Sequence, residues 1–409
     1  MADLIGPLRD DILNGSIDPE TALRLMYYKS AAHHYRCNRE WQKSYDICTE
    51  ALKTVPKDCK YLYTIYEELS IICYYLGKID EGYTASDHIV TSATVPYRIR
   101  NYTLSNQQFY MSKLPFSRVI DTDFRTDCAD FVPSSASILS RGTGYRLNIR
   151  SVNYRVIDGN YIPQGSNLII TRNHIVDLDK DFKSVDCKEL IDKSGYPMTY
   201  RPWSRGLEDV RLICDGSFLC TTPDTNSKNI PQLVYGEYNT EDGAITKIVP
   251  LQLGPNLKCE KNWLPFIGED DGQLYAVYSM DPLTIVKITP DSDLRLEDRV
   301  QIVQTEDSIR LPAFRGSGGL LKYKGGYLCS VHQVYYNKNR LYFHRLVWFN
   351  KDFTQYKYSK NYYLESPNIE YTLSMCHSDE GLIIPYSVRD SCSRLGILPY
   401  TTVDAILGI

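Results

Sequence analysis

The sequence predicts a protein of two parts, a helical front part followed by a five-bladed β-propeller. Over residues 18–112, apolar positions recur every three or four residues, which is the periodicity of amphipathic helices. From Ser134 to the C-terminus, a short polar motif followed by apolar strand runs, a turn and a charged loop is repeated five times. Successive motifs begin roughly 53 to 73 residues apart, near the length of a four-stranded blade. We therefore expect a helical domain at 1–115 and a propeller at 116–409.

The composition is that of a soluble globular protein. Hydrophobic residues make up 43% and charged residues 23% of the 409 residues, and the formal net charge is −4. A negative net charge gives no basis for a nucleic-acid partner. The N-terminus lacks the cationic start and apolar stretch of a secretory signal, and no apolar run is long enough to span a bilayer. The 12 cysteines are scattered and include no CxxC pair, so we expect a cytoplasmic protein with reduced thiols.

The front part has four segments with a helical pattern, at residues 20–38, 40–56, 62–78 and 79–96. They resemble two tetratricopeptide-type hairpins, because Trp41 and Ile79 open the second helix of each pair and Pro56 and Pro96 end it. Two such repeats bury too little surface alone, so we expect a further helix at 101–114 to cap them. The helical part is either a structural spacer or a surface that docks a protein partner.

The five polar motifs of the second part are expected to begin the innermost strands of the blades. They are PSSASI (133–138), GLEDVR (206–211), EKNWLPF (260–266), FRGSGG (314–319) and SMCHSDEG (374–381). The innermost strands of a propeller surround a central channel, so side chains from all five motifs should meet in one funnel.

Three segments of this part resemble a known enzyme family. GLEDVRL (206–212) is similar to the G-x-E-D-P-R motif in the second blade of mannoside phosphorylases and related β-mannosyl enzymes, the glycoside hydrolase family 130-like group. Residues 325–353 resemble the fourth blade of that family and residues 381–397 its fifth. The resemblance covers about residues 134–405. Val210 replaces the Pro of the motif, EKNW stands in place of a His-x-Lys-Asp type motif, and Ser387 stands in place of a Gly.

Two adjacent carboxylates lie in the second motif. Neighbouring residues of a strand face opposite sides, so one of Glu208 and Asp209 should enter the funnel and the other should point into the blade. The resemblance implies that Asp209 is the catalytic general acid, with Glu208 or Arg211 as its orienting partner. A Glu-Asp-x-Arg turn can also be a salt bridge that locks a blade.

Inverting glycosyl transfer needs an acid and a second species on the opposite face of the sugar, which is a phosphate in a phosphorylase. Cationic side chains on the third, fourth and fifth motifs or inner strands would converge on such a phosphate if the propeller closes. They are Lys261, Arg315, His332 and Arg389. By resemblance, His332 matches the anion-binding position of the family best.

Five further residues are assigned to the substrate site, namely Asn262, Trp263, Asp281, Tyr386 and Asp390. Trp263 either offers its face to a pyranose ring or packs between blades, and Lys261 and Asn262 either contact the ligand or cap a strand. The glycines of FRGSGG form either an anion nest or a tight entry to the inner strand. No group of His, Cys, Asp and Glu has metal-binding spacing, and we expect no metal and no cofactor.

These features predict a carbohydrate-active enzyme that acts on a mannose-like glycoside by inverting transfer to phosphate or to a sugar acceptor. Its ligands would be a glycan, inorganic phosphate or a sugar phosphate. Two other functions are compatible with the same residues: a non-catalytic adaptor that binds glycans or proteins, and an accessory domain of a glycosyltransferase.

Overall fold

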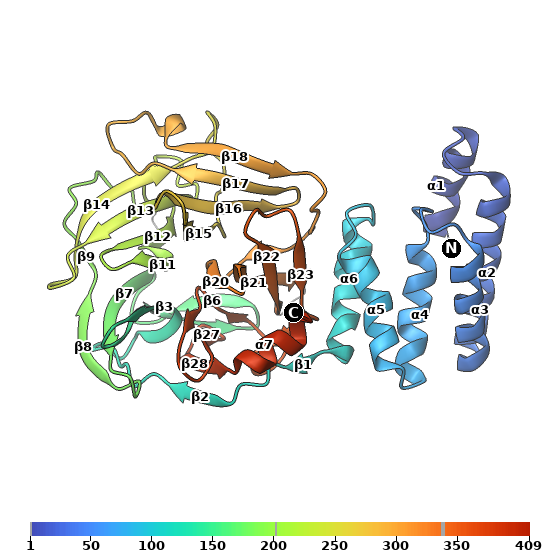
Figure 1. The fold of residues 1–409 in the computed structure, drawn as a ribbon, viewed down its shortest axis with the longest axis horizontal. Helices are drawn as coiled ribbons and strands as arrows, with labels where there is room; N and C mark the ends of the chain where they lie inside the picture. The colour runs from blue at the N-terminus through green and yellow to red at the C-terminus, as the bar shows by residue number, and fades with distance from the viewer. Residues whose placement is uncertain (1, 201–202, 337–339) are drawn as a thin grey trace. The chain divides into compact units, whose positions relative to one another are not determined.

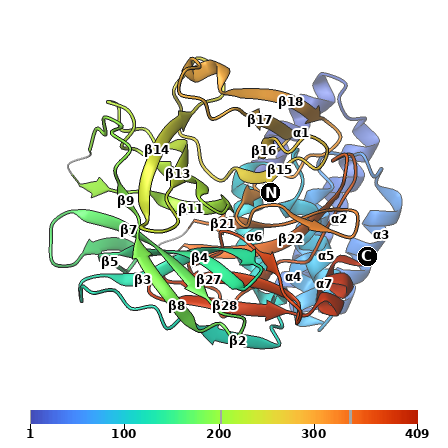
Figure 2. The ribbon, with the colours of Figure 1, turned by 60° about the vertical axis from the view of Figure 1, so that its left-hand side comes forward.

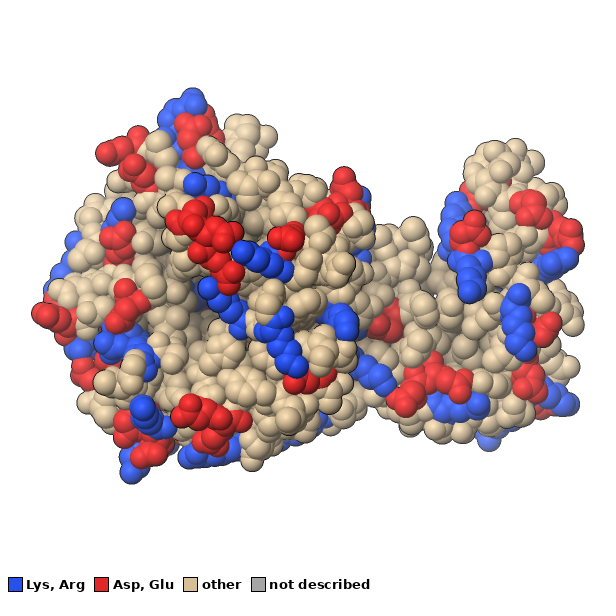
Figure 3. Space-filling view, in the orientation of Figure 1, with Lys and Arg blue, Asp and Glu red and all other residues tan. Residues whose placement is uncertain are grey.

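The computed structural model describes residues 2–200, 203–336 and 340–409. The chain divides into two compact units, residues 1–111 and 112–409. Within the described residues, no helix is both long and apolar enough to cross a membrane. On the face drawn in Figure 3, Lys and Arg side chains are interspersed with Asp and Glu side chains on each unit. Residues 337–339 of the segment that resembles the fourth blade lie outside the described part of the chain.

The first unit consists of helices (Figure 1). They are α1 (Ala2–Leu13), α2 (Pro19–Cys37), α3 (Trp41–Thr54), α4 (Tyr63–Tyr75), α5 (Ile79–Val90), α6 (Tyr97–Gln107) and the short 3-10 turn η1 (Gln108–Tyr110). Asp18 caps α2 by accepting a hydrogen bond from the backbone N–H of Thr21 at 2.9 Å. The sequence pattern did not predict α1, because Gly6 and Pro7 interrupt its helical signal.

The helix expected at 101–114 begins and ends earlier, as α6 and η1. Pro96 immediately precedes α6, a position where its fixed φ and missing N–H cost little. The core of the unit is apolar and includes Leu25, Ile65 and Ile72. Glu68 is also buried there, and it is neutralised by Lys29 at 2.8 Å, as a buried carboxylate requires.

In its described residues, the second unit contains five sheets of four or more strands. The first sheet has β3 (Val132–Arg141), β4 (Gly144–Val152), β7 (Ile169–Leu178), β8 (Ser184–Glu189) and β10 (Ser204–Arg205). The second has β11 (Glu208–Cys214), β12 (Ser217–Thr222), β13 (Gln232–Tyr238), β14 (Ala244–Leu251) and β9 (Ile191–Asp192). The third has β15 (Leu264–Ile267), β16 (Leu274–Met280), β17 (Leu283–Ile288) and β18 (Val300–Glu306), after the turn η2 (Leu296–Asp298).

The last two sheets include strands from both ends of the unit. The fourth has β19 (Arg315–Gly316), β20 (Leu321–Tyr323), β21 (Gly326–Tyr335), β22 (Leu341–Asn350), β23 (Tyr356–Tyr358), β24 (Tyr362–Tyr363) and β1 (Ser112–Lys113). The fifth has β25 (Glu370–Tyr371), β26 (Cys376–His377), β27 (Leu382–Val388), β28 (Ser393–Leu398) and β2 (Arg118–Asp121).

The five sheets follow one another around a centre in a propeller-like arrangement (Figures 1 and 2). Each of the five polar motifs includes residues of a strand at one edge of a sheet, in order β3, β11, β15, β19 and β26. Apolar clusters lie between neighbouring sheets, such as the one that contains Leu219 of the second sheet and Leu274 of the third. The expectation of a helical part followed by a propeller-like part is therefore confirmed.

Two local features shape the second unit. β2 pairs with β28, with Asp121 opposite Arg394, so the beginning and the end of the unit share the fifth sheet. Between β4 and β7 the chain forms a separate hairpin, β5 (Tyr154–Ile157) and β6 (Asn160–Pro163). Asp158 and Gly159 turn this hairpin with φ of 49° and 77°, which is the dipeptide and conformation of a type I′ turn. The chain ends in a helix that the pattern did not predict, α7 (Tyr400–Leu407).

Candidate functional site

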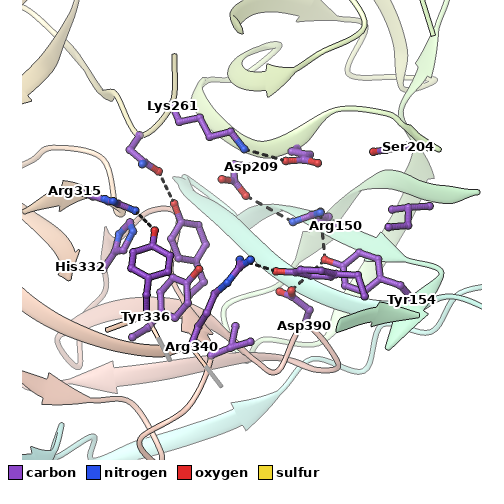
Figure 4. A pocket seen from close by; sticks show the side chains of 17 residues that line it. Arg150, Tyr154, Ser204, Asp209, Lys261, Arg315, His332, Tyr336, Arg340 and Asp390 are labelled. Carbon is purple, nitrogen blue, oxygen red and sulfur yellow. Dashed lines mark hydrogen bonds and ion pairs between the residues drawn. The ribbon is translucent and has the colours of Figure 1, made fainter. Parts of the chain in front are cut away.

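All five sheets contribute side chains to one central cavity (Figure 4). Its lining includes Arg150 of β4, Asp209 of β11, Asn262 just before β15, His332 of β21 and Tyr371 of β25. The cavity has a volume of about 400 Å³, within the range of small-molecule sites. Convergence of five distant chain segments on one polar cavity marks it as the candidate active site.

Both carboxylates of the second motif line this cavity, which corrects the expectation that only one of them would. The reason is a bulge: the pairing of β11 with β12 shifts register between Glu208 and Arg211, and Asp209 has a φ of +53°. A bulge breaks the alternation of side chains along a strand. Left-handed backbone at a residue with a side chain is strained, and such strain concentrates at functional sites.

Each of these carboxylates has a cation nearby. Arg150 Nη1 lies 3.7 Å from Asp209 Oδ1, and Lys261 Nζ lies 3.7 Å from Glu208 Oε2. The Arg150 side chain is only 10% exposed. Its burial acts to lower its pKa, but the negative charges of Glu208, Asp209 and Asp390 outweigh that effect and raise the pKa above its ordinary value. Arg150 is therefore a permanent cation beside the pair of carboxylates.

A third carboxylate, Asp390, is held by two hydroxyl groups. Ser134 Oγ donates to Asp390 Oδ1, and Tyr154 Oη donates to Asp390 Oδ2, both at 3.0 Å. Asp390 has a φ of +50°, so it is a second strained residue in the wall of the cavity. The Arg150 guanidinium contacts Tyr154 Oη at 3.5 Å, which connects Asp390 to the side of the cavity that holds Asp209.

Two other guanidinium groups of the cavity have no carboxylate partner among the described residues. Arg315 donates a hydrogen bond to Tyr336 Oη at 2.7 Å, and Arg340 donates one to Tyr161 Oη at 3.2 Å. Neutral phenols orient these cations and leave their charge uncompensated. Guanidinium groups in this state are suited to bind carboxylate or phosphate oxygens.

His332 adds a neutral imidazole next to Arg315, which is its partner in the β19–β21 pairing. The ring is buried, and its Nδ1 lies 2.6 Å from Ser317 Oγ. Burial holds the pKa of His332 well below its usual value, and the positive charge of Arg315 acts in the same direction. His332 can therefore offer a hydrogen bond to a ligand without being a cation at neutral pH.

Arg211 lies behind the cavity wall, only 1% exposed, and supports it. Its guanidinium donates to the backbone oxygens of Ser317 and Asp209 and to Tyr371 Oη, each at 3.2 Å. Tyr371 in turn donates to Asn262 Oδ1 at 3.1 Å. A single buried side chain thus connects, directly or through Tyr371, cavity residues of the second, third and fifth sheets.

The structure brings together Glu208, Asp209, Lys261, Asn262, Arg315, His332 and Asp390 of the predicted site residues. It does not bring Arg211, Trp263, Asp281, Tyr386 or Arg389 into the cavity lining. These five side chains lie elsewhere in the second unit.

Two of these five residues, Trp263 and Tyr386, are aromatic and lie in the interior of the second unit. Trp263 is 1% exposed, belongs to the apolar cluster between the second and third sheets, and donates from Nε1 to Glu260 Oε2 at 3.2 Å. Tyr386 is fully buried, stacks on Phe116 with ring centroids 5.6 Å apart, and donates to Glu365 Oε1 at 2.8 Å. Of the two roles considered for Trp263, the structure shows packing between sheets.

Apart from the buried Arg211, the polar residues outside the lining, Asp281 and Arg389, lie at the surface. Asp281 lines a neighbouring hollow of about 220 Å³ and pairs with Arg310 at 3.3 Å. Arg389 is exposed beside Asp390. In FRGSGG, a Cβ added to Gly316 would lie 2.2 Å from the backbone oxygen of Asn262, so this glycine permits close approach of the third and fourth sheets.

Sequence reasoning missed several lining residues, notably Arg150, Tyr154, Tyr161, Arg340 and Tyr371. Two of them lie on the β5–β6 hairpin, and its Asp-Gly turn was a usable signal. The others lie on inner strands or turns without a distinctive motif. In the described ranges, no set of three His, Cys, Asp or Glu side chains is arranged to hold a metal ion.

No protein-family model matches the chain, and no curated protein matches it. Among solved structures, it is similar to the β-1,2-mannobiose phosphorylase from Listeria innocua in complex with β-1,2-mannobiose, with 14% identity and a TM-score of 0.45 over 71% of this chain and 96% of that one. A mannose phosphorylase from Leishmania mexicana, in complex with phosphate ion, shares 13% identity with a TM-score of 0.45 over 70% of this chain and 89% of that one.

A third similar structure comes from work on the GH130 family of mannoside phosphorylases, which contains glycoside hydrolases that target β-1,2 mannosidic linkages in Candida mannan. It shares 10% identity with a TM-score of 0.43, over 71% of this chain and 94% of that one. The structural neighbours are thus mannoside phosphorylases and related glycosidases with a propeller-like arrangement. Similarity at this level assigns no activity, which has to be inferred from the side chains of the cavity.

Proposed function

We propose that this chain is a cytoplasmic carbohydrate-active enzyme whose five sheets are the five blades of a β-propeller, and that it transfers a glycosyl group with inversion to phosphate. The main support is the distribution of charge around the central cavity. Glu208 and Asp209 lie together on the second sheet, whereas Arg315 and Arg340 have no carboxylate partner among the described residues. A site of this kind can hold a proton donor and an anionic nucleophile at the same time.

In the proposed reaction, protonated Asp209 gives its proton to the glycosidic oxygen as the bond from that oxygen to the anomeric carbon breaks. A phosphate oxygen forms the new bond to the anomeric carbon from the opposite face. The products are a sugar 1-phosphate of inverted anomeric configuration and the released sugar. Arg150, 3.7 Å from Asp209 Oδ1, stabilises the carboxylate that is left until water protonates it again.

Tyrosine side chains support a sugar as the substrate. Tyr154, Tyr161, Tyr336, Tyr342 and Tyr371 all line the cavity, and each combines an aromatic face with a hydroxyl group. Aromatic faces suit the C–H faces of a pyranose, and fixed hydroxyl groups suit its hydroxyls. We assign a mannose-like sugar because residues 206–211 resemble the motif of mannoside phosphorylases.

The test is a phosphorolysis assay with β-mannobioses and inorganic phosphate, read as release of mannose 1-phosphate, with the anomeric configuration followed by NMR. Titrations with mannose, mannose 1-phosphate, nucleotide sugars and phosphate accompany it. We expect an inverted sugar 1-phosphate from at least one mannoside. A cavity that binds none of these ligands would contradict the proposed enzyme. Sugar binding without turnover would instead favour a glycan-binding module.

Within the same proposal, the helical unit is a pair of tetratricopeptide-like hairpins that docks a protein. Exposed aromatic side chains on this unit, among them Tyr74, Tyr75 and Phe109, support this role. Capture of a partner by the full chain, and loss of capture in a Tyr74→Ser, Tyr75→Ser variant, would test it. Equal capture by both forms would place the docking surface elsewhere.

A further inference from the structure

The two arginines without carboxylate partners occupy different places in the cavity. In Figure 4, the guanidinium of Arg315 points toward Tyr336, whereas that of Arg340 points the other way, toward the wall that holds Tyr154 and Asp390. The phosphate of the proposed reaction needs one of these positions. The second arginine has no function in that reaction.

The surroundings of Arg315 are suited to the phosphate. It is paired with His332 across β19 and β21, and it shares the border of the neighbouring hollow with Lys261 and Asn262. One guanidinium, one ammonium, one imidazole and one amide therefore lie on the same side of the cavity. These are the donor groups that bind a tetrahedral oxyanion.

The surroundings of Arg340 include two of the tyrosines that we assign to the sugar, Tyr161 and Tyr154. Arg340 lies over the ring of Tyr161, 5.7 Å from its centroid, and donates to its hydroxyl. The Tyr161 ring meets Tyr154 edge to face at 5.0 Å, and Tyr154 donates to Asp390. Asp390 is already satisfied by Tyr154 and Ser134, and no ion pair joins it to Arg340 among the described residues.

A partly buried guanidinium without a counter-charge is costly, so its retention in a binding cavity indicates an anionic ligand. We propose that the sugar substrate has an acidic group of its own, a phosphate or a carboxylate, and that Arg340 with Tyr161 binds it. This inference rests on the proposed function and specifies its substrate class: an acidic glycoside is bound in addition to inorganic phosphate. A guanidinium binds two oxygens of either acid group at once, so both sources share the same chemistry.

The test uses the full chain and isothermal titration with mannose, mannose 6-phosphate, mannuronate and inorganic phosphate. The wild type should bind mannose 6-phosphate or mannuronate about ten-fold or more tightly than mannose, the scale of one hydrogen bond to a charged group. Arg340→Gln should abolish this preference and leave the affinity for inorganic phosphate unchanged. Arg315→Gln should weaken the binding of inorganic phosphate by about ten-fold or more. Arg295→Gln, at an exposed arginine just before the η2 turn, is the control and should change neither affinity.

Three results would overturn the inference. The first is equal affinity of the wild type for mannose and both acidic sugars, which would leave the proposed function intact. The second is a preference for acidic sugars that survives in Arg340→Gln. The third is a loss of inorganic phosphate binding in Arg340→Gln as large as that in Arg315→Gln, since it would mean that one anion occupies both positions. Failure to bind any of the four ligands would instead contradict the proposed function together with this inference.

Discussion

Arg211 Nη1 donates a hydrogen bond to the backbone oxygen of Asp209 at 3.2 Å, and the backbone of Asp209 is left-handed, with a φ of +53°. The same guanidinium contacts Ser317 and Tyr371. Arg211, considered above as an orienting partner of Asp209, therefore acts from behind the wall, where it holds a strained residue in place.

Replacement of Arg211 by methionine should preserve much of the side-chain volume and remove all three hydrogen bonds. We expect the free energy of unfolding to fall by roughly 2 to 4 kcal/mol, because hydrogen bonds to charged groups are worth more than neutral ones and are not additive. Urea unfolding measures this loss. An unchanged midpoint and slope would show that Arg211 does not support the wall.

Asp209→Asn removes the proposed proton donor and keeps the shape of the side chain. Turnover of the best mannoside should fall about 10²- to 10⁴-fold, the usual contribution of general acid catalysis. The control is Asp293→Asn, at an exposed aspartate outside the cavity, which should retain full turnover. Equal kcat values for the wild type and Asp209→Asn would assign the acid to another group.

Trp263→Phe separates packing from sugar binding. The variant loses indole volume and the hydrogen bond to Glu260, so stability should fall by about 1–3 kcal/mol. Its affinity for a sugar should not change, because Trp263 is 1% exposed and lies outside the cavity. A large loss of affinity at unchanged stability would contradict this placement.

Gly316→Ala tests the close approach of the third and fourth sheets. The new Cβ would lie 2.2 Å from the backbone oxygen of Asn262, so the two sheets must move apart or distort. We expect a lower melting temperature together with weaker ligand binding, because Asn262 lines the cavity. The control is Gly325→Ala, at a turn where an added Cβ meets nothing within 4 Å, so that an alanine is introduced without a steric contact. The φ of +72° at Gly325 adds some backbone strain in this control. Identical melting temperatures for wild type and Gly316→Ala would contradict the prediction.

Stability should decrease as the pH falls from about 6.5 to 5. Burial lowers the pKa of His344 to about 4, so the folded protein leaves this ring neutral, whereas in the unfolded chain the ring binds a proton below about 6.5. Unfolding therefore takes up a proton, at a cost to stability of up to about 1.4 kcal/mol per pH unit for one such ring. Urea unfolding at several pH values should give a shallower pH dependence for His344→Phe than for the wild type. The buried ring of His332 still makes the stability of the His344→Phe variant depend on pH. The assignment to His344 would therefore be contradicted only if the wild type and the variant showed the same pH dependence.

The repeat of polar motifs was sufficient to predict the order of the sheets, because each motif begins a run of strands with its own turns. Helix α1 was missed because its glycine and proline resemble the residues that end helices. The pairing of β2 with β28 involves residues far apart in the chain, and no local pattern reports such a contact.

The sequence predicted those residues of the candidate site that are charged and belong to one of the five polar motifs, as Asp209 and Arg315 do. The bulge at Asp209 was not predicted, because alternation along a strand is the default and its failure depends on pairing with β12. Arg150 and Arg340 were missed since each is a single arginine in a sequence with many. Whether a tryptophan or tyrosine packs inward or faces a ligand depends on the neighbouring sheet, which the sequence does not identify.

The hydrogen bond from Arg394 to Asp121 joins residues 273 positions apart. During synthesis, β2 leaves the ribosome long before β28 exists, so it must wait unpaired while the intervening sheets form. Contacts of such long range slow folding, and an unpaired strand edge is prone to associate with other chains. The nascent protein is therefore expected to depend on protection by chaperones until its last strand is made, and a prematurely terminated chain should be removed or aggregate.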